Sequence, residues 1–261
     1  MINKFKEIYE YREMIFSSVK KELTARYKKS VLGFLWTFIN PLCQIIIYTL
    51  VFSYILDMRA SIENFPIFLI VALIPWLFFS SSITAGSMII VSQQDMVKKI
   101  YFPREVLPIS YVTSGFVNML FCFIIVFLAI ALFGIGFNFQ ALLFLPIMMI
   151  LEYALTLGLT LIVSACTVYL RDLEHILGVL MQAWIYLTPI MYSLEIVPKE
   201  FRFVFELNPM TTIVEGYRAI LYYGQVPSAI LLLKSALWGI CALVLGFYVF
   251  GKLQKGFAEE L

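Results

Sequence analysis

The sequence predicts an all-α membrane protein with six membrane-spanning helices. Hydrophobic residues make up 62% of its 261 residues and charged residues only 14%, whereas soluble domains carry about 25% charged residues. The chain also contains long uncharged runs, each near the roughly 20 residues that cross the hydrocarbon core as a helix. These runs are apolar on all faces. Barrel strands would alternate apolar and polar residues, so helices are predicted.

Six such runs are bounded by charged residues or turn signals. The fifth is the shortest. The first is too long for the apolar part of a signal peptide, so we expect no cleaved leader. The predicted spans cover residues 31–56, 65–91, 107–135, 141–168, 176–192 and 229–250.

Basic residues predict the orientation of the chain. The loops on one side of the membrane hold 14 Lys or Arg residues, with eight in 1–30, three in 92–106, one in 169–175 and two in 251–261. The loops on the other side hold four. Because Lys and Arg gather on the cytoplasmic side of membrane proteins, both termini are predicted to be cytoplasmic. The net charge of +2 hides this asymmetry and suggests no nucleic-acid partner.

Charge also divides the chain into an interface helix in residues 1–30 and a six-span domain in residues 31–261. Apolar residues of the first part recur at near-helical spacing among Lys, Arg and Glu, which predicts an amphipathic helix on the membrane surface. This helix either anchors the protein to the membrane or docks a soluble partner, and both readings stay open. The apolar positions are Phe5, Ile8, Ile15, Val19 and Leu23.

Two loops differ in character. Residues 92–106 form a mixed-charge cytoplasmic segment that is suited to contact a partner protein. Residues 193–228 lie on the outer side and are too apolar for a merely solvated loop. We expect two short helices there that dip partway back into the membrane. They separate near Asn208 and Pro209, since proline restricts the residue before it.

The residues do not assemble a catalytic centre. Residues 246–252, GFYVFGK, match the start of a phosphate-binding GxxxxGK loop, but Leu253 stands where Ser or Thr is needed and the stretch ends an apolar span. His175 is the single histidine, too few for a hydrolytic triad or a histidine metal site. The four cysteines lack metal-ligand spacing. We therefore predict no enzymatic activity, metal or cofactor on this chain.

Polar and aromatic residues within the spans are candidate functional groups. Glu152 stands inside the fourth span, where an ionisable group is costly unless paired, protonated or hydrated, so it either makes a structural contact or serves transport. Trp and Tyr gather at membrane interfaces in general, but the remainder suit a conduit in which sugar rings slide over aromatic faces. The aromatic candidates are Trp36, Tyr48, Trp76, Phe79, Trp184, Tyr186 and Tyr192.

Four ordered segments resemble the type-2 ABC exporter permeases of the polysaccharide and polyol-phosphate group, which includes O-antigen, capsule and teichoic acid permeases. The resemblance runs from Lys21 to Arg218. The segments are KELTARYKKSVLGFLWTFINP at 21–41, KKIYFPREVLPI at 98–109, RDLEHILGVLMQAWIYLTPIMY at 171–192 and ELNPMTTIVEGYR at 206–218.

This resemblance implies a homodimer in the bacterial inner membrane, with each subunit bound to a separate cytoplasmic ATPase that holds the ATP and Mg²⁺. The implied cargo is a polysaccharide on a polyprenyl pyrophosphate lipid, with O-antigen favoured. A capsule or teichoic acid exporter and a small-molecule permease for drugs or haem are the alternatives. An ion channel or secondary transporter fits poorly, because Glu152 is nearly alone as a charge within the spans.

The resemblance also assigns roles to residues. Asn40 and Glu152 join the aromatic residues above as conduit candidates. The ATPase-coupling candidates are Arg26, Tyr27, Lys28, Asp95, Lys98, Lys99, Arg104 and Glu105. The outer-gate candidates are Asn208, Pro209, Glu215 and Arg218, which are otherwise read as loop scaffold.

Overall fold

The computed structural model describes residues 2–27, 30–55 and 62–261. Within these ranges the chain forms helices and turns and contains no β-strand, which confirms the prediction of an all-α membrane protein. Five helical stretches are long and apolar enough to cross a membrane. They are Gly33–Ser53, Phe65–Gly86, Val106–Leu132, Phe139–Tyr169 and Ala229–Glu260.

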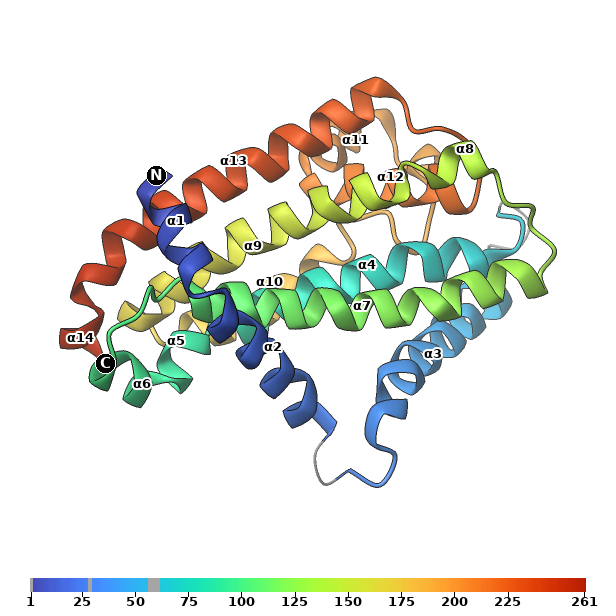
Figure 1. Ribbon diagram of the computed structural model, residues 1–261. Helices are drawn as coiled ribbons and strands as arrows, with labels where there is room; N and C mark the ends of the chain where they lie inside the picture. Colours follow the sequence, from blue (N-terminus) through green and yellow to red (C-terminus); the bar gives the residue numbers. More distant parts are fainter. Residues whose placement is uncertain (1, 28–29, 56–61) are drawn as a thin grey trace.

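Each stretch contains one main helix, and three of them carry short helical extensions (Figure 1). The main helices are α3 (Trp36–Thr49), α4 (Phe65–Gly86), α7 (Val106–Leu132), α9 (Leu145–Tyr169) and α13 (Ala229–Leu253). The extensions are η1 (Gly33–Leu35) and η2 (Leu50–Ile55) around α3, α8 (Phe139–Leu142) before α9, and η5 (Gln254–Gly256) and α14 (Phe257–Glu260) after α13.

The count of six spans is not confirmed, because the predicted fifth span is a short helix. In its place lies α10 (Leu173–Trp184), whose 12 residues extend about 18 Å. The chain then turns through residues 185–192 rather than continuing as a helix. Pro189 lacks the N–H that a helix would need there. The carbonyl of Leu187 instead accepts a hydrogen bond from the side chain of Asn208, at 2.9 Å.

The outer segment folds as predicted into helices that separate at Asn208 and Pro209. After the short turn η4 (Leu194–Ile196) come α11 (Lys199–Leu207) and α12 (Pro209–Leu221). The Oδ1 atom of Asn208 accepts a hydrogen bond from the Met210 N–H at 3.0 Å and so caps α12, and Pro209 takes the first helical position. α11 has no fully buried residue, whereas most of α12 is buried.

α4 is the central helix of the bundle. Of its most apolar 18-residue window, 78% is buried inside the protein, against 44% or less in the other four stretches. It contacts α3, α7, α9, α10 and α12. α4 is apolar on all faces, as expected for a helix that is buried on every side. α3 and α10 pack against it and each keep one face exposed.

α9 packs along α13 more closely than any other pair of described helices. A Cβ atom added to Gly158 would lie 2.2 Å from the backbone carbon of Ala242, and one added to Gly246 would lie 2.4 Å from the Gly158 carbonyl oxygen. Both distances are far below van der Waals contact. Glycine at these two positions therefore allows the backbones to touch, as small residues do in packed membrane helices.

The chain termini share one end of the bundle, together with the short helices α5 (Ile89–Ser92) and α6 (Gln94–Lys99) (Figure 1). The predicted N-terminal helix is divided at Tyr11 into α1 (Ile2–Glu10) and α2 (Arg12–Tyr27). α2 lies against α7. Tyr11, Met14 and Ile15 pack against the core, so this helix is attached to the bundle as well as suited to a membrane surface. The charged helix α6 and the C-terminal segment with Lys252 and Lys255 thus lie at this end, whereas α2 runs away from it (Figure 1).

Candidate functional site

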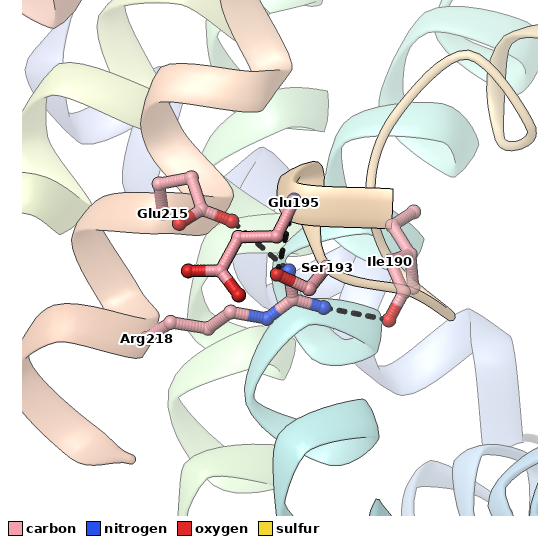
Figure 2. A network of polar contacts seen from close by, with 5 residues as sticks. All are labelled: Ile190, Ser193, Glu195, Glu215 and Arg218. Carbon is pink, nitrogen blue, oxygen red and sulfur yellow. Dashed lines mark hydrogen bonds and ion pairs between the residues drawn. The ribbon is translucent and has the colours of Figure 1, made fainter. Parts of the chain in front are cut away.

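Arg218 of α12 forms the centre of a buried polar network at the other end of the bundle (Figure 2). Its side chain is fully buried, with 0% of the residue exposed. Nη1 donates to Glu215 Oε1 at 3.0 Å, and Nη2 donates to the Ile190 carbonyl oxygen at 2.7 Å. The guanidinium carbon lies 3.5 Å from the centre of the Phe68 ring. Arg218 thereby joins α12 to α4 and to the turn that follows α10.

A buried guanidinium is retained only where its charge is compensated. Burial lowers the pKa of Arg218 to about 10, while the carboxylate of Glu215 acts in the opposite direction. Arg218 therefore stays positively charged near neutral pH. Its Nε atom has no hydrogen-bond partner among the described residues, so compensation comes from Glu215, one carbonyl and the face of Phe68. Beside this network, the Ser193 hydroxyl caps η4 by accepting from the Glu195 N–H at 3.3 Å.

Asn208 forms a second junction between the end of α10 and the start of α12. Its Oδ1 accepts from the indole N–H of Trp184 at 3.0 Å as well as from Met210. Its Nδ2 donates to the Leu187 carbonyl and to the Thr188 hydroxyl, at 2.9 and 2.8 Å. Both N–H groups of this side-chain amide thus donate a hydrogen bond, and its oxygen accepts two. The turn after α10 is thus held by Asn208 at Leu187 and Thr188 and by Arg218 at Ile190.

Glu152 of α9 lies in the protein interior, where the hydroxyl of Tyr217 donates to its Oε2 at 2.6 Å. Its Oε1 has no hydrogen-bond partner among the described residues. The sequence left open whether Glu152 makes a structural contact or serves transport. The bond to Tyr217 is a structural contact of this kind. The assignment of Glu152 to a conduit stays a prediction.

The aromatic conduit candidates fall into two groups. Trp76 and Phe79 are buried in α4, and the ring of Phe79 packs edge-on against Trp184, 5.5 Å between centres. Trp36 and Tyr186 are 47% and 63% exposed. Their role as conduit residues stays a prediction for both groups, but only the second group presents a surface within the single chain.

Trp36 and Tyr186, together with candidates that are only half-buried, lie on α3 and on the turn after α10. Trp36 and Asn40 border a cleft of about 280 Å³ between α3, α4 and α7. Tyr48 is half-buried in α3. Tyr192 is also half-buried, and its hydroxyl donates to the Tyr186 carbonyl. The structure thus brings Tyr186 and Tyr192 together within the turn after α10.

The ATPase-coupling candidates also lie in different surroundings. Asp95 and Lys99 form an exposed ion pair of 3.1 Å on α6, and Lys98 is exposed beside them. Arg104 and Glu105 instead face the segment after α13, where the Nε2 of Gln254 donates to Glu105 Oε1 at 2.9 Å.

Two of the coupling candidates, Arg26 and Tyr27, are the last residues of α2, and Lys28 lies outside the described residues. Sequence reasoning missed the two most exposed apolar residues of the loop, Ile100 and Tyr101, at 59% and 85% exposure. Their position directly after two lysines in a charged loop was the available signal.

Comparison with known proteins identifies the class. The family described as ABC-2 type transporter matches residues 13–222. The chain therefore belongs to the ABC-2 type transporter family, which confirms the resemblance and a role in transport as a multi-pass membrane protein.

Individual relatives match over nearly the whole chain. The O-antigen export system permease protein RfbA of Myxococcus xanthus is 35% identical over 263 residues, covering 100% of both chains. A Klebsiella pneumoniae protein of the same name is 30% identical over 251 residues, 95% of each chain. The polysialic acid transport protein KpsM of Escherichia coli is 24% identical over 234 residues, 88% of this chain and 89% of the relative.

Proposed function

We propose that this protein is the membrane-spanning subunit of an ATP-driven exporter that moves a lipid-linked polysaccharide, O-antigen, across the bacterial inner membrane. The observation that carries the cargo is the 35% identity, over the full length of both chains, to an O-antigen export permease. Both termini lie in the cytoplasm in this arrangement. Support comes from the sequence count of 14 Lys and Arg residues in the loops predicted to be cytoplasmic, against four in the other loops.

ATP is bound and hydrolysed, with Mg²⁺, by a separate ATPase subunit that contacts the end of the bundle holding α5 and α6. The exposed charges of Asp95, Lys98 and Lys99 support this contact, because charged side chains at a wet interface guide association and partner choice. The chain's own GxxxxGK match lies wholly within α13 rather than in a loop between a strand and a helix. Two ATPase subunits would serve two permease subunits.

Two copies of the permease form a homodimer with the conduit between them. α3 and the segment of α10 and its following turn support this arrangement, since both flank α4 and keep one face open. Apolar side chains on such a face can be covered by lipid alone. The amide of Asn40 and the hydroxyl of Tyr186 are also exposed there, and polar groups are costly in hydrocarbon unless water or a polar cargo meets them. Flat aromatic faces beside them suit sugar rings.

Transport then requires the outer end to open. In the proposed cycle, ATP closes the two ATPase subunits, their motion moves α5, α6 and α2, and the spans shift as rigid elements. α12 moves with the turn after α10, because Arg218 and Asn208 join the two. Hydrolysis resets the cycle. Membrane lipid surrounds the dimer throughout, and the pyrophosphate of the cargo lipid is attracted to the basic end of the bundle.

Depletion of the protein in its native host tests the proposed function. Lipid-linked glycans are extracted and analysed by gel and mass spectrometry, while surface polysaccharide is measured in parallel. We expect a polyprenyl-linked polymer to accumulate and the surface polymer to disappear, with both reversed by a plasmid copy of the gene. The sugar composition of the accumulated polymer also distinguishes O-antigen from capsule, the cargo suggested by the 24% identity to a polysialic acid transport protein. Unchanged pools in both assays contradict polysaccharide export and favour a small-molecule permease.

A further inference from the structure

The loop between α6 and α7 has one fixed side and one open side. We refer to residues 100–105 as the tip segment. Its first two residues, Ile100 and Tyr101, are exposed, whereas Glu105 at its other end is buried. An adjacent aliphatic and aromatic pair that projects from a charged surface is the composition of a protein contact, because exposed aromatic residues are enriched at interfaces.

The fixed side is held by residues 253–257, which we refer to as the brace. Arg104 donates through Nη1 to the Gln254 carbonyl, and the Gln254 side chain donates to Glu105 at 2.9 Å. The Arg104 guanidinium also lies 5.7 Å from the centre of the fully buried Phe257 ring. The brace thus contacts both charged residues of the tip segment through a side-chain bond, a backbone bond and a ring.

The brace is in turn fixed to the two closely packed helices. The hydroxyl of Tyr169, the last residue of α9, donates to the Leu253 carbonyl at 2.8 Å, and its ring centre lies 6.3 Å from that of Phe257. Phe250 of α13 packs edge-on against Phe257, 5.5 Å between centres. A Cβ atom on Gly256 would lie 2.4 Å from the Tyr169 hydroxyl oxygen, so a larger residue there would displace the Tyr169 side chain.

Phe102 and Pro103 of the tip segment are buried as well, whereas the side of Ile100 and Tyr101 is open. A cleft of about 490 Å³ lies between Glu7 of α1, the tip segment and the brace. The tip segment itself has no regular helix between Lys99 and Val106. Phe102 already joins the tip segment to the core, and the brace adds contacts at its Arg104 and Glu105 end. A push on Tyr101 can then reach α9 and α13 through the brace.

We propose that residues 253–257 position the tip segment for a partner ATPase, which is contacted through Ile100 and Tyr101. Arg104 and Glu105 are then positioning residues rather than ATPase contacts. The inference rests on the proposed function for the nature of the partner. It adds a route by which movement of the ATPase reaches α9 and α13.

The test uses the complete permease–ATPase complex, with a photo-crosslinking amino acid in place of Tyr101. Adduct formation with the ATPase is measured, as are glycan exported and ATP hydrolysed per inserted permease. In the otherwise natural sequence we expect an adduct. Gln254→Ala is expected to lower both the adduct yield and the export per ATP by roughly fivefold, the loss that one typical hydrogen bond would give. Phe257→Ala should lower both by more, because it removes a fully buried ring. Glu259→Ala, at an exposed position just beyond the brace, is the matched control and should change neither.

A merely structural role predicts a different pattern, in which less permease is inserted but each inserted molecule exports at the normal ratio to ATP. That pattern, or unchanged adduct and export ratio in both variants, overturns the proposal. If Phe257→Ala does not insert, Gln254→Ala carries the test, because it removes one side-chain bond from a half-buried position. Glycan accumulation on depletion without any adduct at position 101 overturns the positioning inference and leaves the proposed function intact. An adduct without glycan accumulation contradicts the cargo instead.

Discussion

Replacing Arg218 by methionine removes the buried charge of α12 while keeping most of the side-chain length. The change leaves the Ile190 carbonyl without its 2.7 Å donor and Glu215 without its 3.0 Å ion pair. Loss of one partner of a buried pair costs about 3–5 kcal/mol. The Glu215 side chain is 28% exposed and is partly solvated on its own, so we expect a value near the lower bound, about 3 kcal/mol.

Thermal unfolding of the purified protein in detergent measures this loss. For a chain of this size 1 kcal/mol corresponds to about 2–4 °C, so Arg218→Met should lower the Tm by roughly 6–12 °C. Lys199→Met, at an exposed position of α11, is the matched control and should leave the Tm unchanged. Glu215→Gln keeps an acceptor and should give an intermediate decrease. A decrease below about 2 °C for Arg218→Met would refute the conclusion that this network fixes α12 to its neighbours.

Three further predictions concern packing, a buried hydrogen bond and the conduit. Gly158→Ala forces α9 and α13 apart and should cost about 1–3 kcal/mol in thermal unfolding, whereas Gly178→Ala in α10, whose Cβ would meet open space, should cost nothing. Tyr217→Phe removes the one hydrogen bond given to Glu152 and should lower stability by about 1–3 kcal/mol, and an unchanged Tm would show that the bond contributes nothing. Tyr186→Ala, at a largely exposed position, should reduce glycan export per inserted permease without lowering the Tm, and unchanged export would remove this residue from the conduit.

Much of the fold could be predicted because its signals are local. Long apolar runs located the five spanning stretches, and Asn208 followed by Pro209 located the break between α11 and α12, since a capping side chain and proline act on adjacent backbone. The predicted span at 176–192 shows the limit. Its length was predicted from the run of apolar residues, but the helix ends at Trp184. The carbonyl of Leu187 then accepts a hydrogen bond from Asn208, the residue that caps α12.

The candidate site was predicted less fully for the same reason. Arg218 was named from its segment, but its buried setting depends on Phe68 of α4 and on the Ile190 carbonyl, which are distant in the sequence. Arg104 was predicted to couple to the ATPase, from its place in a charged cytoplasmic loop. Its partners come from the segment after α13, and nothing local to the loop indicates them.

The most direct test of polysaccharide export is reconstitution of the permease with its ATPase in liposomes that contain the radiolabelled lipid-linked glycan from the depleted host. Glycan that crosses the bilayer is measured by its change in accessibility to a glycan-degrading enzyme added outside. The proposed function predicts a change that requires ATP and Mg²⁺ and is abolished when the permease is omitted. An ATPase that hydrolyses ATP in this complex while the glycan keeps its original accessibility would contradict it.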